Sequence, residues 1–397
     1  MNLRTFLAMA GLFAPALACT DPKPSAQRTD LPPLTTLEPV GSLRESDGVA
    51  FETDPLAGTY TREDALAFVD VSNQQIALFD RDGKQTGTLG RRGQGPGEFQ
   101  GAEAMFALSS DSLAAFDRQR QSMTFVVNGK ISLASIDFQS WQFDFDDALR
   151  IVGRFANGDW VGLKRSPRPH RGVGARAVFD TPTVVVGSPS QPPRELFRLP
   201  PRRLVNVVGP GWTTRIALTE LAPASGTVCD SGIVVADTLG VRVISVTGKV
   251  KSSFRLPVKR LPLTSLTGGR DGVVARAVYR LRPGAQTVDA MRVLASFAAG
   301  VDSMLQQPTL DARGDAWFPT FVKGGVSGGI GHLRFDTHGA IVGTYTSAQA
   351  PTLIGQRSFL ALGVEKETES GVFHVYPLKN NTQDKMELGF CSTPFQF

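Results

Sequence analysis

Residues 90–99 constrain the fold of this chain more than any other stretch. They read GRRGQGPGEF, with four glycines and one proline in ten residues. Neither the interior of a helix nor that of a strand tolerates this density of glycine and proline. A strand-turn-strand pattern precedes the stretch and another follows it, so it predicts a shaped connection between two β-units.

Each residue type in this stretch has a structural role that needs no ligand. The glycines permit positive φ, the proline stiffens the turn, and the phenylalanine is expected to anchor between neighbouring β-units. The glutamate is expected to accept backbone N–H groups or to pair with an arginine. A phosphate-binding loop is the alternative, but the GxxxxGK[ST] and GxGxxG patterns are absent and a strand follows instead of a helix. The expected structural residues are Gly90, Gly93, Gly95, Pro96, Gly97, Glu98 and Phe99.

Two segments far apart in the chain are copies of one hairpin pattern. Residues 76–90 read IALFDRDGKQTGTLG and residues 332–346 read HLRFDTHGAIVGTYT. A strand, a polar turn closed by glycine and a second strand account for both. The strand before such hairpins recurs in six copies, at residues 65–70, 112–117, 159–164, 232–237, 315–320 and 371–376.

The spacing of the six copies predicts a six-bladed β-propeller. The first three copies start 47 residues apart, which fits a blade of four short strands. The longer steps need insertions: residues 165–201 suit a long hairpin or loop, and residues 287–306 have the apolar spacing of one inserted surface helix. Since the ring must close, we expect residues 37–43 to complete the last blade beside residues 386–391.

The pattern GxxGxGPGEF at residues 90–99 closely resembles the blade-to-blade connection of NHL-type six-bladed β-propellers. The resemblance covers about residues 40–397. It implies an all-β fold, and many bacterial exported lipoproteins combine such a propeller with a signal, a cysteine and a short tether. The resemblance therefore implies a ligand- or partner-binding module of the cell envelope.

The first 18 residues have the features of a signal peptide. Arg4 supplies a positive charge, and residues 6–18 form an apolar run that is too short to span a bilayer. Ala16-Leu17-Ala18, with small residues at the two positions that a signal peptidase reads, precedes Cys19. This pattern resembles a bacterial lipobox, which would make Cys19 the lipidated N-terminus. Leucine is usual where Ala16 stands, so ordinary cleavage before an unmodified Cys19 remains open.

The rest of the chain divides into a tether and the propeller. Residues 19–39 are rich in Pro, Thr, Ser and Asp, which suits a solvated tether, and residues 40–397 hold the propeller. We expect an exported protein, either in the bacterial cell envelope or secreted.

Composition and cysteine usage exclude some classes of function. The hydrophobic content of 41% argues against a disordered chain. The net charge is +5, and no run of five or six basic residues occurs, so nucleic-acid binding is not expected. Cys229 and Cys391 permit a disulfide in an exported chain, but two free buried thiols are an equal alternative.

No catalytic or metal-binding constellation is recognisable in the sequence. The four histidines, at 170, 332, 338 and 374, show no HxH or HxxxH spacing, and GxSxG is absent. Asp70, Asp117 and Asp237 end repeat strands and raise the question of calcium, but an acid in a turn more often bonds its local backbone. We predict no catalytic residue, metal ligand or cofactor. We expect calcium or another divalent metal only under the alternative hypothesis, in which the protein is a lyase- or lactonase-like enzyme with its site in the central channel.

Two features are candidates for a binding surface. One is an aromatic residue beside an arginine on an expected loop at residues 209–215, a combination that is common in recognition sites. The other is the basic insertion at residues 165–176, which suits a phosphorylated lipid or an anionic glycan. A blade-packing tryptophan and a solvated basic loop are the alternatives. The candidate residues are Arg168, His170, Arg171, Trp212 and Arg215.

Together these features predict a monomeric binding propeller. Its expected partner is an envelope protein or a small ligand, and it reaches the membrane through a lipid anchor if Cys19 is modified.

Overall fold

A computed structural model gives the fold of the chain, which divides into residues 1–31 and residues 32–397. The described residues all belong to the second unit, so the signal peptide and Cys19 lie outside them. They are residues 32–43, 58–61, 65–109, 112–141, 149–165, 174–209, 212–217, 225–237, 240–255, 261–262, 292, 303–304, 308–320, 330–348, 351–364, 371–378, 388–392 and 394–396.

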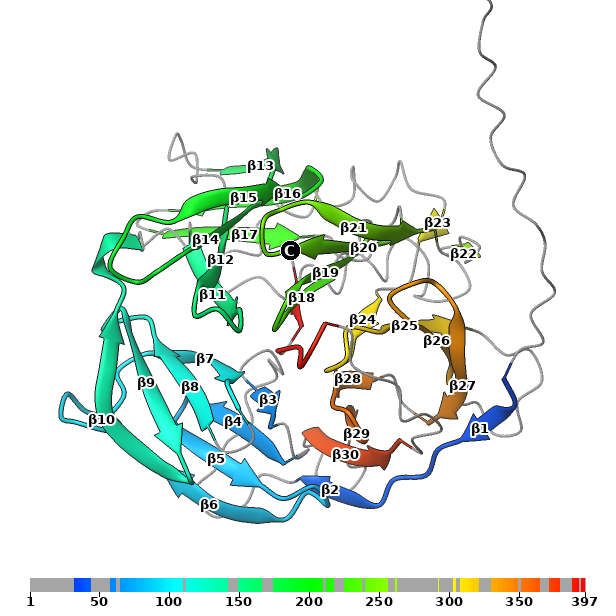
Figure 1. The fold of residues 1–397 in the computed structure, drawn as a ribbon, viewed down its shortest axis with the longest axis horizontal. Helices are drawn as coiled ribbons and strands as arrows, with labels where there is room; N and C mark the ends of the chain where they lie inside the picture. Colours follow the sequence, from blue (N-terminus) through cyan, green and yellow to red (C-terminus); the bar gives the residue numbers. More distant parts are fainter. Residues whose placement is uncertain are drawn as a thin grey trace, which may run out of the picture. The chain divides into compact units, whose positions relative to one another are not determined.

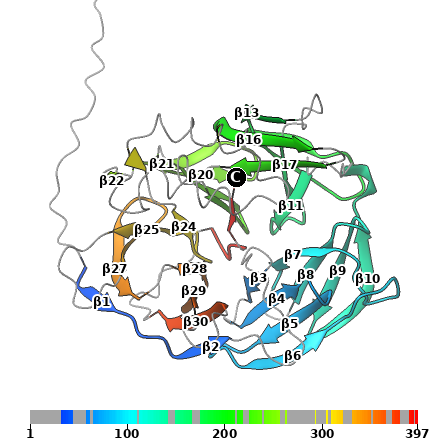
Figure 2. The same ribbon diagram turned by 180° about the vertical axis from the view of Figure 1, so that it is seen from behind.

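The second unit is a six-bladed β-propeller (Figures 1 and 2). Each blade is an antiparallel sheet of four strands in meander order. The first three blades consist of β3 (Gly58–Tyr60), β4 (Leu66–Asp70), β5 (Gln75–Phe79) and β6 (Gln85–Leu89); β7 (Ala102–Ala107), β8 (Ser112–Asp117), β9 (Ser122–Val127) and β10 (Lys130–Asp137); and β11 (Leu149–Arg154), β12 (Trp160–Lys164), β14 (Thr183–Gly187) and β15 (Arg194–Arg198).

The remaining blades have the same construction. They consist of β18 (Ser225–Cys229), β19 (Gly232–Asp237), β20 (Gly240–Ser245) and β21 (Val250–Phe254); β24 (Thr309–Leu310), β25 (Ala316–Thr320), β26 (Ile330–Phe335) and β27 (Ile341–Ser347); and β28 (Pro351–Ile354), β29 (Ser358–Val364), β30 (Gly371–Pro377) and β2 (Gly41–Leu43). Helix is almost absent from the described residues, which hold a 3-10 turn at Gln139–Trp141 and the helical Arg292.

Apolar side chains fill the spaces between neighbouring blades all around the ring. Among the described residues, a separate cluster lies between each adjacent pair of blades, including blades six and one. The inner strands also contact one another in turn, from β3 through β7, β11, β18, β24 and β28 back to β3. Each blade thus buries both of its faces against its neighbours, which no blade can do alone.

The prediction of six repeat strands is confirmed for five copies and wrong for the sixth. The first five copies are β4, β8, β12, β19 and β25, the second strands of their blades. The sixth, at residues 371–376, is β30, the third strand of blade six, and the equivalent second strand is β29 at Ser358–Val364. Second and third strands are both buried within a blade and therefore show the same apolar pattern. Blade six also takes its fourth strand from the N-terminus, so no following strand marks the correct register.

The N-terminal segment closes the ring, as predicted, but with a different partner. Strand β2 pairs antiparallel with β30, with Leu43 opposite Phe373. Just before it, β1 (Leu34–Thr36) pairs parallel with β27 of blade five. The expected partner at residues 386–391 is wrong for its described part, because residues 388–391 lie against blade four instead.

The prediction of an insertion over residues 165–201 is only partly right, because β14 and β15 within this range are the third and fourth strands of blade three. The inserted part contains an additional strand. Strand β13 (Gly174–Asp180) lies between β12 and β14 in the sequence and pairs with β16 (Arg202–Gly209), which also pairs with β17 (Trp212–Ala217). We call β13, β16 and β17 the accessory sheet.

The predicted surface helix at residues 287–306 lies mostly outside the described residues. Within that range Arg292 is helical, but β23 (Ser303–Met304) is extended and pairs with β22 (Leu261–Pro262). A helix that continues to residue 306 is therefore wrong.

The meander order gives the ring two unlike ends. In every blade, the turn after the first strand and the turn after the third lie at one end, which we call the turn face. The turn after the second strand and the link to the next blade lie at the other end, which we call the connection face. Both parts of the accessory sheet, β13 and the pair β16–β17, are inserted at connections of this second kind. They leave blade three at the same end and pair with each other there.

Closure by the N-terminus leads to a testable difference between two leucines. Leu43 on β2 is 1% exposed between blades six and one, whereas Leu34 on β1 is 51% exposed. We expect Leu43→Ala to lower the free energy of unfolding by about 2–5 kcal/mol because it leaves a cavity between blades. Leu34→Ala is the control and is expected to change it by less than about 0.5 kcal/mol. Urea denaturation measures both; equal losses would contradict closure through β2.

Candidate binding surface

The glycine-rich connection at residues 90–99 is fully engaged in the structure. Glu98 accepts hydrogen bonds from the backbone N–H of Gly95 at 2.8 Å and from Nε of Arg91 at 2.7 Å. These two contacts, in this order, lower the pKa of Glu98. Phe99 is fully buried between blades one and two. A Cβ at Gly93 would come within 2.0 Å of the Glu98 carboxylate. The glutamate side chain therefore fills the space inside the loop and leaves no room there for a phosphate.

The acids that end the repeat strands bond to the protein itself. Asp117 accepts the backbone N–H groups of Gln100, Gly101 and Arg120 at 2.7–3.1 Å. Asp70 accepts the backbone and side-chain amides of Asn73. Asp237 pairs with Arg242 at 2.7 Å. In the described part of the chain, no group of three or more His, Cys, Asp or Glu residues is placed to hold a metal ion.

The histidines are dispersed. His332 on β26 is buried, with Nε2 3.3 Å from the hydroxyl of Ser347, and burial lowers its pKa to about 4. His338 lies in the turn between β26 and β27, and His374 lies on β30. His170 lies outside the described residues.

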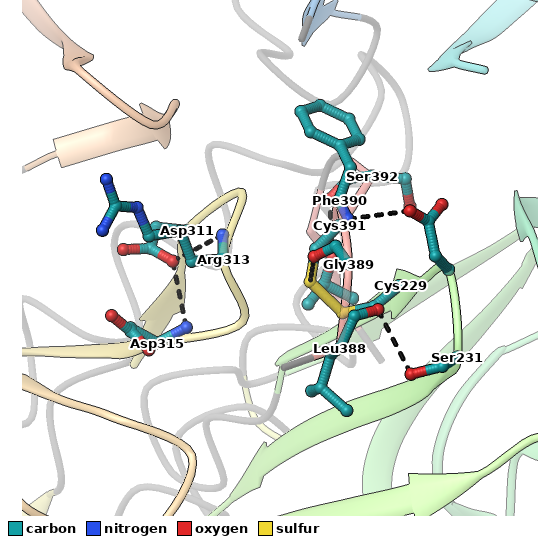
Figure 3. Close-up of a disulfide and its surroundings, with 12 residues drawn as sticks. Cys229, Ser231, Asp311, Arg313, Asp315, Leu388, Gly389, Phe390, Cys391 and Ser392 are labelled. Carbon is teal, nitrogen blue, oxygen red and sulfur yellow. Dashed lines mark hydrogen bonds between the residues drawn. A yellow bond between two sulfur atoms is a disulfide. The ribbon is translucent and has the colours of Figure 1, made fainter. Parts of the chain in front are cut away.

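The C-terminal segment, residues 388–392 with β31 (Phe395–Gln396), covers part of the turn face (Figure 3). Its Cys391 forms a disulfide with Cys229 at the end of β18. The backbone N–H of Cys391 donates to Ala312 of blade five, and that of Ser392 donates to Val228 of blade four. Strand β31 then pairs with β18, so blade four gains a fifth strand on its inner edge. This side of the channel is thus occupied by the protein's own backbone.

A buried ionic cluster lies at the first turn of blade five, the turn that contains Ala312. One amino group of Arg334 contacts Asp311 at 3.1 Å and Asp315 at 2.6 Å, and the indole of Trp317 donates to Asp311 at 3.0 Å. Burial and the adjacent Asp311 raise the pKa of Asp315 to about 7. Burial alone would lower the pKa of Arg334, but Asp311 and Asp315 raise it. Each of the three charged groups has an oppositely charged partner within the blade, although the buried Nε of Arg334 has no hydrogen-bond partner. This arrangement favours a role in fixing the turn on which the C-terminal segment rests.

The accessory sheet lies outside the six blades, so ring closure does not need it. Trp212 and Arg215 lie on β17, so the expectation that they occupy a loop is wrong. The chain is extended here because β17 pairs with the neighbouring β16 along its whole length. Arg168, His170 and Arg171 lie outside the described residues.

Positive charge is concentrated in blade three and this sheet. Residues 149–217 contain twelve Lys or Arg and three Asp or Glu, a formal charge of +9, whereas the whole chain carries +5. The rest of the chain is therefore at −4. Of the basic residues, four lie at the connection-face ends of blade three or just beyond, and four lie in the accessory sheet: Arg150, Lys164, Arg165 and Arg198; Arg176, Arg202, Arg203 and Arg215.

Asn206 is an anomaly at the centre of this sheet. It lies on β16 between the buried Val205 and Val207, and it is itself 0% exposed. Neither its amide nitrogen nor its amide oxygen has a hydrogen-bond partner. Each unsatisfied buried polar atom costs about 1–3 kcal/mol, so an apolar residue would suit this position better in the free protein. In the sequence it is a lone asparagine in the apolar run LVNVV.

Removal of the disulfide tests the attachment of the C-terminal segment. The bridge closes a loop of 162 residues, and we expect Cys229→Ser with Cys391→Ser to lower the free energy of unfolding by about 2–5 kcal/mol. Urea denaturation of the wild-type protein with and without a reducing agent is the control, since reduction should reproduce the double variant. Identical midpoints in the two conditions would show that the bridge does not form.

Titration of Asp315 gives a second test. A carboxyl whose pKa is raised to about 7 when folded stabilises the fold below its unfolded pKa near 4, and this contribution is lost as the pH rises through 7. Asp315→Asn stays neutral throughout. The melting temperature of the variant relative to wild type should therefore rise between pH 5.5 and pH 8.5, because only the wild type acquires a buried charge. A difference that does not change with pH would mean that Asp315 is ionised over the whole range. His332, present in both proteins, cancels.

No family model matches the chain, and no curated protein is similar in sequence. Among solved structures, a member of the DUF4221 family from Bacteroides vulgatus is 10% identical, with a TM-score of 0.44 over 87% of this chain and 98% of that chain. Regucalcin, a calcium-binding protein from Agrobacterium tumefaciens, is 10% identical, with a TM-score of 0.38 over 87% and 97%. A virginiamycin B lyase from Staphylococcus aureus, solved with quinupristin, is 13% identical, with a TM-score of 0.34 over 83% and 98%. These are distant likenesses of fold. In the described residues, no helix is long and apolar enough to cross a membrane.

Proposed function

We propose that this protein is a non-enzymatic binding propeller of the bacterial cell envelope, and that it recognises an anionic partner on the connection face of blade three. The observation that carries the proposal is the charge distribution. A formal charge of +9 in residues 149–217, against −4 for the rest of the chain, creates a local positive field that attracts acidic groups. The proposal needs neither a metal nor a cofactor.

The structure of the insertions supports the choice of face. Two separate insertions of blade three pair with each other to build a sheet that the ring does not require. On the turn face, by contrast, the C-terminal segment covers the inner ends of blades four and five. A recognition surface built from insertions is free to vary without loss of the ring, which is the usual division between scaffold and binding loops.

The location in the envelope is part of the same proposal and comes from the N-terminal sequence. The apolar run before Cys19 directs export, and lipidation of Cys19 would anchor the propeller through the tether. Membership of the NHL-type propellers and a monomeric state are further elements of the proposal. The intact mass of the mature protein tests the anchor, because a lipidated Cys19 adds the mass of its acyl chains.

Charge reversal tests recognition on this face. Lys164 ends β12 on the connection face, and Arg176 is exposed on β13. We expect Lys164→Glu with Arg176→Glu to weaken binding of poly-L-glutamate by about tenfold at low salt, and by less as salt screens the field. Fluorescence anisotropy with a labelled polymer measures the affinity.

The matched control reverses the same number of charges on the turn face. Arg81→Glu with Lys249→Glu changes two exposed residues in the turns after β5 and β20. This control should bind poly-L-glutamate almost as well as wild type. Equal loss in both double variants would mean that only net charge matters, and the proposed face would be wrong.

A further inference from the structure

We propose that Asn128 is a site of spontaneous covalent modification, at which the asparagine converts to aspartate and β-aspartate. Gly129 follows it, and these two residues form the turn between β9 and β10 on the turn face of blade two. The inference is independent of the proposed function. It starts from a comparison with a second Asn-Gly turn, Asn157-Gly158 on the turn face of blade three, where the hydrogen bonding is different.

The reaction needs these two residues and water. The backbone nitrogen of Gly129 loses its proton to the solvent and attacks Cγ of Asn128, so that a bond forms between them while the bond from Cγ to Nδ2 breaks. Ammonia leaves, and the product is a five-membered cyclic imide. Water then opens the ring at either carbonyl, which gives aspartate, or a β-aspartate whose side-chain carbon has joined the main chain. Glycine favours the attack because it has no Cβ beside its nitrogen.

Both reacting groups are available at Asn128. This residue and Gly129 are exposed. In the described part of the chain, neither the amide of Asn128 nor the backbone N–H of Gly129 makes a hydrogen bond. A Cβ at Gly129 would meet no atom within 4 Å, so no neighbouring side chain crowds the turn. The two groups can therefore approach each other without loss of a hydrogen bond of either one.

The corresponding groups are engaged at Asn157, although this residue is also exposed. Its side-chain oxygen accepts the backbone N–H of Asp159 at 3.0 Å, and its nitrogen donates to the Asp159 carboxylate at 3.0 Å. The backbone N–H of Gly158 donates to the carbonyl of Phe155 at 3.0 Å, and its own carbonyl accepts Nε of Arg154 at 3.2 Å. Ring closure at Asn157 must first break the hydrogen bonds of both reacting groups.

The type of turn explains this difference. In the outer hairpin turns of blades one, four and five, the glycine N–H donates to the carbonyl three residues earlier, at Gly83, Gly248 and Gly339. The turn between β9 and β10 has two residues, both with positive φ, 50° at Asn128 and 69° at Gly129. Such a turn is typical of Asn-Gly and leaves no earlier residue of the loop to accept the glycine N–H.

The hairpin can also open at this end. Two residue pairs, Lys130 with Val127 and Ile131 with Val126, lie between the turn and the irregularity that interrupts the pairing of β9 with β10. A short ladder at an exposed end opens at a lower free-energy cost than the core of a blade. Local opening gives Asn128 the backbone freedom that it needs to bring the glycine nitrogen to its Cγ.

The products are expected to weaken blade two. Both add a carboxylate at the turn, and the β-aspartate also adds one carbon to the main chain of a tight two-residue connection. Val126 and Ile131, next to the turn, pack in the apolar cluster between blades one and two. A turn that no longer fits the two strands disturbs this packing, so we expect the modified protein to melt at a lower temperature.

The first test measures acid formation at both Asn-Gly sites of the unmodified chain at mildly alkaline pH. Peptide mapping by mass spectrometry quantifies aspartate and β-aspartate. In the folded protein we expect Asn128 to convert at least about tenfold faster than Asn157, because hydrogen bonds raise the barrier at the latter. In guanidinium chloride the two rates should become similar. Equal rates in the folded protein, or a tenfold difference that persists after unfolding, would overturn the proposal.

The second test uses Asn128→Gln, which keeps an amide but can close only a six-membered ring, a much slower reaction. Glutamine suits the backbone here, since Gln74 and Gln121 have φ of 55° and 52° in this structure. After incubation the melting temperature of the wild type should fall, whereas that of Asn128→Gln should stay at its starting value. Asn157→Gln is the control and should change as the wild type does. An equal fall in all three proteins would overturn the assignment to Asn128.

Discussion

The structure depends on the burial of each blade between two neighbours. A single four-stranded sheet of this length exposes two apolar faces, and the six apolar clusters between blades cover them in pairs. One break in the ring would expose two faces at once. The chain therefore completes its last blade with β2, a strand from the opposite end of the sequence. This closure leaves no gap between the last blade and the first.

Closure of the ring also determines where other features can accumulate. In an antiparallel meander every second turn lies at the same end of the sheet. Insertions after a second strand and insertions between blades therefore both lie on the connection face. The accessory sheet forms because both kinds occur in blade three. At the opposite end the turns are short, and the C-terminal segment packs across them through Cys391 and Ser392. One end of the ring is thus stabilised by its own chain, and the other is enlarged.

The sequence allowed prediction of the strands that form the blades, but not of the pairings between segments that lie far apart in the chain. Apolar alternation and turn residues are local, so β4, β8, β12, β19 and β25 were recognisable from the chain alone. Some pairings are not local. Strand β2 pairs with β30, and Cys229 forms a disulfide with Cys391, only because ring closure places these distant segments next to each other. Trp212 and Arg215 were misplaced for a different reason: the glycine and proline before them suggested a loop, whereas residues 212–217 pair with β16, the strand directly before them in the sequence.

The sequence allowed prediction of only some properties of the candidate binding surface. Positive charge can be counted along a chain, but the missing hydrogen bonds of Asn206 exist only after folding has removed its amide from water. Asn206 lies between Val205 and Val207 in an apolar run, and no local sequence pattern predicts that folding leaves both polar atoms of its side chain without a partner.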